Sequence, residues 1–282
     1  MGGRKGGAEM NGRFENRYGI LAGRTATHIY LLPSPALRPF VAHYTICPGS
    51  AGGPGGGGLL TLVPDASGCL VFTDAGDALE SRVYGPTTAA VTVENDLNGG
   101  PLRFFVEFRP GGEYAFLPVP QWELADRVLP LADLHPGLAR AMSRLWRACP
   151  DLDEFVRGAD AALAGICRNT LDFSRLLSHL AASRAPAPAA ALAAYTGYSQ
   201  RHLARLLREG AGLSAKAFAR VLRVNAAARA LREGAPSLTR LAQELGYYDQ
   251  SHFIHDFRAV CGVSPSRYRA GLSDFYNEPL KF

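Results

Sequence analysis

Hydrophobic positions follow two different patterns along the chain, and the change falls near residue 136. Between residues 29 and 116, short apolar runs such as 59–63, 69–73 and 102–108 are separated by turn signals rich in glycine, asparagine and aspartate. Many short strands at this spacing are typical of an antiparallel sandwich or small barrel. Beyond residue 136 the apolar residues recur at the spacing of amphipathic helices, with glycine and proline as breaks. The predicted fold class is therefore α+β, with a β-rich part followed by an all-α part.

The length of the chain predicts two domains. Its 282 residues are about twice the usual size of a single domain. We expect a disordered arm at 1–19, a β-rich domain at 20–135, a helical linker at 136–169, a helical domain at 170–272 and a tail at 273–282. The linker contains two amphipathic helices, whose apolar residues suffice either for a dimer interface or for a simple connection between the two halves.

Positive charge is concentrated in the C-terminal third. The whole chain has 30 lysine and arginine residues against 25 aspartate and glutamate residues, whereas residues 186–282 alone hold 13 against 7. Hydrophobic residues make up 47% of the chain, which is enough for a sizeable core and excludes wholesale disorder. An excess of positive charge at one end favours a polyanionic partner for that end.

The cysteine pattern and the absence of long apolar runs bear on the compartment. Five cysteines are scattered without a CxxC pair, so no disulfide framework is predicted, and free thiols fit a reducing compartment. The N-terminus lacks the apolar run of a signal peptide, and no stretch of about 18 apolar residues could span a bilayer. We therefore expect a soluble, cytoplasmic protein without a membrane partner.

Candidate metal and phosphate ligands are sparse. Between residues 20 and 130 the only histidines are His28 and His43, without an HxH pair. His252 and His255 lie one helical turn apart but have no evident third ligand. The glycine run at residues 52–58 lacks GK[ST] and predicts a flexible connection between strands, not a phosphate cradle. We expect no metal, no cofactor and no catalytic residue.

Two segments of the helical part resemble each other. Residues 191–214 have the sequence ALAAYTGYSQRHLARLLREGAGLS, and residues 240–264 have the sequence RLAQELGYYDQSHFIHDFRAVCGVS. Each predicts a short helix, a glycine-containing turn and a second helix, with Ser199 and Asp249 as the N-caps of the second helices. This is the pattern of a helix-turn-helix unit, although other helical hairpins share it.

The second helix of each unit has a polar side away from its apolar stripe. The residues on that side are Gln200, Arg201, Ala204, Arg205 and Arg208 in the first unit, and Gln250, Ser251, Ile254, His255 and Arg258 in the second. Arginine matches the two major-groove acceptors of guanine, and glutamine matches the acceptor and donor of adenine. A solvated helix face would look the same at any single position, but the repeated pattern in the basic part of the chain favours DNA.

A continuous helical pattern at residues 214–232 joins the two units. A helix of this length spans about 28 Å at a rise of ~1.5 Å per residue. It can hold two recognition helices at a separation close to the helical repeat of B-DNA, about 34 Å. Both helices could then enter successive segments of the major groove. One chain would then read an asymmetric site, with DNA bending where the spacing falls short.

The motifs GYYDQSHFIHDFR at residues 246–258 and GVSPSRYR at residues 262–269 resemble the signature of the AraC family of bacterial transcription regulators. Residues 197–223 are similar to the first helix-turn-helix and the linker helix of the same family. The resemblance implies a seven-helix DNA-binding domain that begins near residue 170 and is fused to a variable regulatory domain.

The resemblance also implies a set of DNA contacts. By position, the base-reading residues are Gln200, Arg201, Ala204, Arg205, Gln250, Ser251 and His255. The residues that contact the DNA backbone are Ser199, Arg208, Asp249, Arg258, Ser264, Ser266 and Arg267, the last three at the start of a final helix whose N–H groups could meet a phosphate. His255 stands where the family often has arginine, and Asp256 places an acid beside it. We therefore expect weaker base reading, or backbone positioning, by the second unit.

Three N-terminal segments resemble a cupin-like β-barrel, the sensor domain of one AraC subgroup. They are LLPSPALRPFVAHY at residues 31–44, LVPDASGCLVF at residues 62–72 and VEFRPGGEYAFL at residues 106–117. Several aromatic residues could line a ligand pocket there, but core packing explains them equally well: Trp122, Tyr44, Tyr84, Phe104 and Phe116. The ligand-binding residues stay unknown.

The predicted function is a sequence-specific DNA-binding transcription regulator, an activator and not an enzyme. Its partner is double-stranded DNA, with an unknown small-molecule effector, RNA polymerase and a second copy of the chain as further expected partners. Two alternatives stay open. The N-terminal domain could only dimerise, or the chain could be a cupin-type enzyme with a helical appendage.

Overall fold

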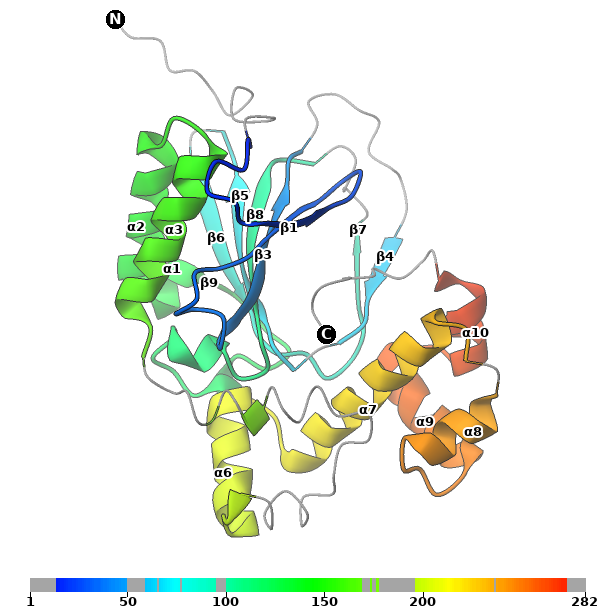
Figure 1. The fold of residues 1–282 in the computed structure, drawn as a ribbon. Coiled ribbons are helices and arrows are strands. Elements are labelled where there is room, and N and C mark those ends of the chain that lie inside the picture. Colours follow the sequence, from blue (N-terminus) through cyan, green and yellow to red (C-terminus); the bar gives the residue numbers. More distant parts are fainter. Residues whose placement is uncertain are drawn as a thin grey trace, which may run out of the picture.

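The computed structural model describes residues 14–49, 59–64, 66–76, 78–94, 100–168, 173, 176–177, 196–235 and 237–272. Its N-terminal part is built from antiparallel sheets with helices on one face, and its C-terminal part is helical (Figure 1). The predicted α+β organisation is therefore confirmed. The arm up to residue 13, the glycine run at residues 52–58 and the tail from residue 273 lie outside the described residues.

Seven strands form one antiparallel sheet in the order β1-β2-β3-β8-β5-β6-β9. In this order the strands are Leu21–Arg24, Ile29–Leu31, Val41–Cys47, Arg103–Phe108, Cys69–Asp74, Leu79–Tyr84 and Val128–Pro130. A second sheet pairs β4 (Leu59–Leu62) with β7 (Val91–Glu94). Within the described ranges the two sheets stay open and do not close into a barrel, so the cupin likeness stays a prediction.

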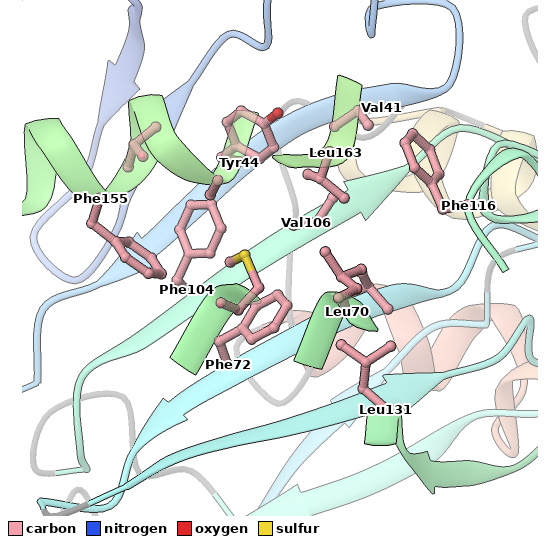
Figure 2. Close-up of a cluster of buried hydrophobic side chains, with 14 of the residues drawn as sticks. Val41, Tyr44, Leu70, Phe72, Phe104, Val106, Phe116, Leu131, Phe155 and Leu163 are labelled. Atoms are coloured by element: carbon pink, nitrogen blue, oxygen red, sulfur yellow. The ribbon is translucent and has the colours of Figure 1, made fainter. Parts of the chain in front are cut away.

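One face of the seven-stranded sheet carries the larger hydrophobic core, because side chains alternate between the two faces of a strand. Tyr44 and Ile46 of β3 lie opposite Val106 and Phe104 of β8, and all four are fully buried. Figure 2 shows Tyr44, Val106 and Phe104 in this core. Phe155 of α3 (Leu152–Ile166) closes over them, with its ring edge-on to that of Phe104 at a centroid distance of 5.3 Å. Burying each such side chain stabilises the fold by about 1.5–3 kcal/mol.

Helices α2 (Pro136–Ala148) and α3 belong to this core. The ring of Trp146 in α2 lies edge-on to that of Phe155, with 5.0 Å between the centroids. Asp160 of α3 accepts hydrogen bonds from the Tyr44 hydroxyl at 2.8 Å and from the Ser34 backbone N–H at 2.9 Å. The two helices that we expected to act as a linker thus pack with the sheet, and their buried residues belong to its core. The position of the domain boundary itself stays a prediction.

Residues 14–19 lie within the arm that we expected to be disordered, but hydrogen bonds hold them against α3. The backbone N–H groups of Glu15 and Arg17 each donate to the Asp153 carboxylate at 2.8 Å, and the Phe14 side chain is buried. The Tyr18 hydroxyl donates to Glu154. Sequence composition misses this contact because its acceptors lie more than 130 residues away in the chain.

The C-terminal part consists of the described helices α6 (Gln200–Ala211), α7 (Ala215–Arg232), α8 (Leu238–Glu244), α9 (Gln250–Cys261) and α10 (Pro265–Ala270). The first half of α7 packs with α6 through Phe218 and Leu222, and its second half packs with α9 and α10, with α8 in the same hydrophobic cluster. The long helix predicted at residues 214–232 is confirmed, with Ser214 as its N-cap. The first helix of the first unit, expected from residue 191, lies outside the described residues.

Two smaller expectations can be compared with the described residues. None of the five cysteines forms a disulfide, and Cys47 and Cys261 are buried. Burial raises the pKa of the Cys261 thiol to about 12, so it stays protonated at neutral pH. In the ranges that the structure describes, none of the helices is both long and apolar enough for a bilayer crossing.

Candidate nucleic-acid interface

The two expected recognition helices begin and end in the same way. At the start of α6 the Ser199 hydroxyl accepts from the His202 N–H at 3.2 Å, and at the start of α9 the Asp249 carboxylate accepts from the His252 N–H at 2.7 Å. Each helix then ends at a left-handed glycine, the conformation that glycine adopts without the steric penalty of a Cβ. The predicted N-caps are confirmed.

The polar side of α6 is open to solvent. Its exposed residues are Gln200, Arg201, Ala204, Arg205 and Arg208. The opposite side is buried through Leu203 and Leu207. Arg205 forms an exposed i,i+4 pair with Glu209 at 3.1 Å. Exposed pairs of this kind contribute only about 0.3–0.5 kcal/mol, so the guanidinium of Arg205 can leave Glu209 for a stronger acceptor at little cost.

The polar side of α9 is also exposed, but Gln250 is held differently from Gln200. Ser251, His255 and Arg258 are exposed, whereas Gln250 is half-buried. The Oε1 atom of Gln250 accepts a hydrogen bond from the Thr239 hydroxyl of α8 at 2.7 Å. This bond orients the amide, and leaves its NH2 group to donate elsewhere.

Asp256 is not part of the exposed side of α9, and the weaker base reading expected of the second unit stays a prediction. Its side chain is buried and lies 3.3 Å from Nε of Arg220 in α7. Two histidine nitrogens of α9, from His252 and His255, lie farther from its carboxylate, at 3.9 and 4.0 Å. Asp256 therefore ties the second recognition helix to α7, while the His255 side chain keeps 81% of its surface exposed.

The expected backbone-contacting residues of the last helix lie together at the start of α10. The Ser264 hydroxyl caps α10 by accepting from the Arg267 N–H at 3.3 Å. Ser266 and Arg267 are exposed, and Tyr268 behind them is fully buried. This arrangement presents one hydroxyl and one guanidinium to solvent beside the helix start.

Sequence reasoning missed two tyrosines that directly precede the N-caps of α6 and α9. Tyr198 stands before Ser199 and Tyr248 before Asp249, and both side chains are exposed, Tyr248 to 93%. The signal was present in the repeat, because YSQRH at residues 198–202 and YDQSH at residues 248–252 match at three positions. Each tyrosine places a hydroxyl beside a recognition helix.

The N-terminal part contacts the first unit at α6. Arg208 lies over the ring of Trp122, 5.0 Å from its centroid, in the short helix η3 (Gln121–Glu123). A Cβ added at Gly212 would lie only 2.7 Å from the Gln121 carbonyl oxygen, so the backbone after α6 passes too close for any larger residue. Arg208, expected at the DNA backbone, is thus also placed to contact the N-terminal part.

The second unit touches the N-terminal part through fewer groups. The backbone N–H of Ala90, just before β7, donates to the Val260 carbonyl of α9 at 2.7 Å. Val63, just after β4, packs against the core of α7 to α10. The contact of Ala90 lies near the C-terminal end of α9, away from the residues that we expect at the bases.

Other candidate residues are used by the fold. Tyr44, Phe104 and Phe116 are buried in the sheet core, as expected from packing alone (Figure 2). Tyr247 of the second unit lies under the guanidinium of Arg223, 5.0 Å from its ring centroid, and burial raises the pKa of Tyr247 to about 12. Among the described residues, no group of three or more metal-ligating side chains comes together.

Comparisons with protein families cover both parts of the chain. Residues 192–271 match the model of a helix-turn-helix domain. Residues 30–130 match the model of a domain of unknown function, DUF6597. The C-terminal part thus matches a helix-turn-helix domain of the AraC type.

Two curated relatives match this C-terminal part. An uncharacterized HTH-type transcriptional regulator of Haemophilus influenzae is 30% identical over 82 residues, which are 29% of this chain and 28% of that protein. The HTH-type transcriptional activator AarP of Providencia stuartii is 33% identical over 90 residues, which are 32% of this chain and 65% of AarP. The chain therefore spans less than two thirds of the length of either relative.

Similar solved structures include a transcriptional regulator with an AraC-type DNA-binding domain from Chromobacterium violaceum. It is 25% identical, with a TM-score of 0.32, and the match covers 35% of this chain and 88% of that chain. ToxT of Vibrio cholerae O395 is 13% identical, with a TM-score of 0.37, and the match covers 86% of this chain and 92% of ToxT.

Proposed function

We propose that this chain is a sequence-specific DNA-binding transcription regulator in which α6 and α9 read adjacent segments of the major groove. One observation carries the proposal: two helices that both start at a side-chain N-cap and expose a polar side pack against the two halves of one long helix, α7. The family match over residues 192–271 supports it, since this is a DNA-binding domain. Affinity would come from phosphate contacts by the basic third, and sequence preference from side chains on the two helices.

The division of roles follows the exposed positions. Gln200, Arg201, Ala204 and Arg205 of α6 would meet bases, and Gln250, Ser251 and His255 of α9 would do the same. Exposed serines, arginines and N-caps at the helix ends would contact phosphates, namely Ser199, Arg208, Asp249, Arg258, Ser264, Ser266 and Arg267. The hydroxyls of Tyr198 and Tyr248 add two donors at these ends.

Control of DNA binding is proposed to run through the N-terminal part. The packing of η3 against α6, with Arg208 over Trp122, supports this because it joins the first recognition helix to the sheet domain. Such control requires that the protein has an arrangement of its two parts that favours DNA binding and one that does not. A small-molecule effector, RNA polymerase or a second copy of the chain would change DNA affinity by binding one of these arrangements more tightly than the other. AarP is named an activator, and we propose activation in the cytoplasm for this chain too. The names of both relatives favour a regulator over a cupin-type enzyme.

The replacement Arg205→Ala tests the proposal. If Arg205 reads a base, binding to a cognate duplex should weaken by about 1–3 kcal/mol. Fluorescence anisotropy with a labelled duplex measures the effect at a fixed, stated salt concentration, because phosphate contacts make affinity depend on salt. A change below a few tenths of a kcal/mol would remove Arg205 from the base-reading residues.

A matched control is available on α3. Arg157 is exposed and pairs with Glu154 within one helical turn, much as Arg205 pairs with Glu209. Arg157→Ala removes the same charge and a similar ion pair at a site remote from α6 and α9, so DNA affinity should stay unchanged. Equal loss in both variants would mean that net charge alone, and not base reading, is responsible.

A further inference from the structure

An open groove lies between helix α2 and strand β6, outside the proposed DNA surface. Its volume is about 470 Å³, within the range of small-molecule sites. Strand β6 contributes Leu79 and Ser81, and the remaining lining residues come from α1 (Leu131–Leu134) and α2: Ala132, Pro136, Ala139, Arg140, Ser143, Arg144 and Arg147. The lining therefore holds three arginines and no acid.

The three arginines form one row along α2. Arg140, Arg144 and Arg147 are four and three residues apart, so they share a face of the helix, and all three are exposed. Like charges at this spacing destabilise a helix. Elsewhere in the described chain, three helical arginines are paired with a glutamate one turn away: Arg157–Glu154, Arg205–Glu209 and Arg240–Glu244.

The arginines of the groove have no such partner. Within the described ranges, no ion pair or hydrogen bond involves the side chains of Arg140, Arg144 or Arg147. Helix α2 from Pro136 to Ala148 contains no aspartate or glutamate at all. The row therefore presents three sets of guanidinium donors to the groove without a counter-charge.

The helix dipole explains only part of this row. A positive charge is favourable in the last turn of a helix, where Arg147 lies, because the C-terminal carbonyl groups carry partial negative charge. Arg140 lies in the second turn of α2, where the dipole gives a positive charge no such stabilisation. A role in helix stability therefore does not account for the complete row.

The floor of the groove supplies an apolar surface and an uncovered strand edge. Leu79 and Ala139 are buried beneath the arginines. Strand β9 pairs with β6 only at residues 82–84. Among the described residues, this edge of β6 therefore has no pairing strand at Ser81. Ser143 donates its hydroxyl to the Ala139 carbonyl at 3.0 Å. The charged groups thus line an apolar base, as in sites for small organic anions.

We propose that this groove binds a small polyanion that carries two or more carboxylate or phosphate groups. Each arginine fork can hold one such group through two parallel hydrogen bonds. The row from Arg140 to Arg147 covers about 10 Å along the helix axis, at ~1.5 Å per residue. That length fits separated anionic groups on one ligand and exceeds the size of a single carboxylate. The site does not depend on the proposed DNA-binding function.

The test is a calorimetric titration of the full chain with citrate and, separately, with inorganic pyrophosphate, at constant ionic strength in sodium chloride. We expect saturable binding of at least one probe at one site per chain. Citrate alone would identify a carboxylate site, and pyrophosphate alone a phosphate site. Failure of both probes to saturate would overturn the proposal.

Two variants separate the groove from general charge effects. Arg144→Gln should weaken probe binding at least tenfold, whereas Arg24→Gln, which removes an exposed arginine of β1, should leave it unchanged. Thermal unfolding without ligand shows whether Arg144→Gln keeps the fold, and Arg140→Gln provides a second groove variant with the same expected loss. Equal weakening by Arg24→Gln, or none by either groove variant, would contradict the site.

DNA is the other polyanion that the groove could meet. If the row bound DNA phosphates, Arg144→Gln would weaken binding to a duplex and reduce its salt dependence. We expect no such change, since the groove is a small-ligand site. A loss of duplex affinity in Arg144→Gln that matches its loss of probe affinity would overturn the proposal in favour of a DNA contact. Absence of duplex binding by the wild-type chain would contradict the proposed function and leave the probe titration as the test of the groove.

Discussion

Helices α6 and α9 are two copies of one local pattern with different surroundings. Both start at a side-chain cap and end at a left-handed glycine, and both expose a polar side. The buried side of α9 packs among aromatic residues of its own unit, with Phe257 between Phe253 and Tyr268. The buried side of α6 shares its cluster with Ala66 and Ala125 of the N-terminal part.

This difference suggests separate roles for the two units. The buried residues of the second unit's core all come from α7 to α10 and their connections, with only the partly buried Val63 added by the N-terminal part, and a buried carboxylate, Asp256, fixes α9 to α7. The first unit depends on the N-terminal part for part of its packing and places Arg208 over Trp122. We therefore expect α9 to be a constant reader of DNA and α6 to be the reader whose position the N-terminal part can adjust.

The largest expected effect comes from Phe257→Ala in the second unit. Removing a fully buried phenylalanine should destabilise this unit by about 3–5 kcal/mol, because a cavity remains. Hydrogen exchange should show lost protection in α8, α9 and α10, while α6 keeps its protection because its core is a separate cluster. Equal loss of protection in α6 would contradict the separation of the two units.

The N-caps provide an intermediate effect and test the similarity of the two helices. Ser199→Ala and Asp249→Ala should each lower the free energy of unfolding by about 1 kcal/mol, because a helix N–H loses its acceptor. Asp249→Ala should cost a few tenths more, since Asp249 also places a negative charge at the helix start. Urea denaturation measures both. If Asp249→Ala were neutral and Ser199→Ala costly, the two starts would not be equivalent.

The smallest expected effect concerns the contact between Trp122 and Arg208. A cation–π contact at an exposed site contributes about 0.5–1 kcal/mol. Trp122→Ala should free Arg208 for a phosphate and tighten duplex binding by up to that amount. The duplex affinity of Trp122→Phe should lie between that of Trp122→Ala and that of the wild type. Fluorescence anisotropy gives the affinities. Weaker binding by Trp122→Ala would mean that Trp122 instead holds α6 in a DNA-competent position.

Local features of the helical part were predictable from the sequence. The N-caps Ser199 and Asp249 depend on residues within one turn, and the start of α7 depends in the same way on its N-cap, Ser214. The repeat also predicted the candidate DNA surface, because equivalent residues of its two copies lie at equivalent positions on α6 and α9. Even so, the exposed Tyr198 and Tyr248 were overlooked, since aromatic residues in a helical part are usually assigned to the core.

Contacts between distant segments were not predictable in this way. Asp256 has a neighbouring histidine in the sequence, but its ion-pair partner with the shortest distance, Arg220, lies on another helix. Likewise, nothing in the sequence around α2 and α3 distinguishes a linker from helices that cover a sheet, because the same apolar stripe serves both. Such choices depend on which surfaces meet in three dimensions, and a single sequence does not encode them in local periodicity.

The central claim is that one chain reads DNA with two recognition helices held by α7. Selection of bound duplexes from random DNA by the purified full chain, at a stated salt concentration, tests it most directly. We predict an asymmetric site with two short motifs whose centres are about one helical turn, roughly 10 base pairs, apart. Arg205→Ala should relax the preference in one motif only. Enrichment of no sequence, or loss of both motifs in that variant, would contradict the account.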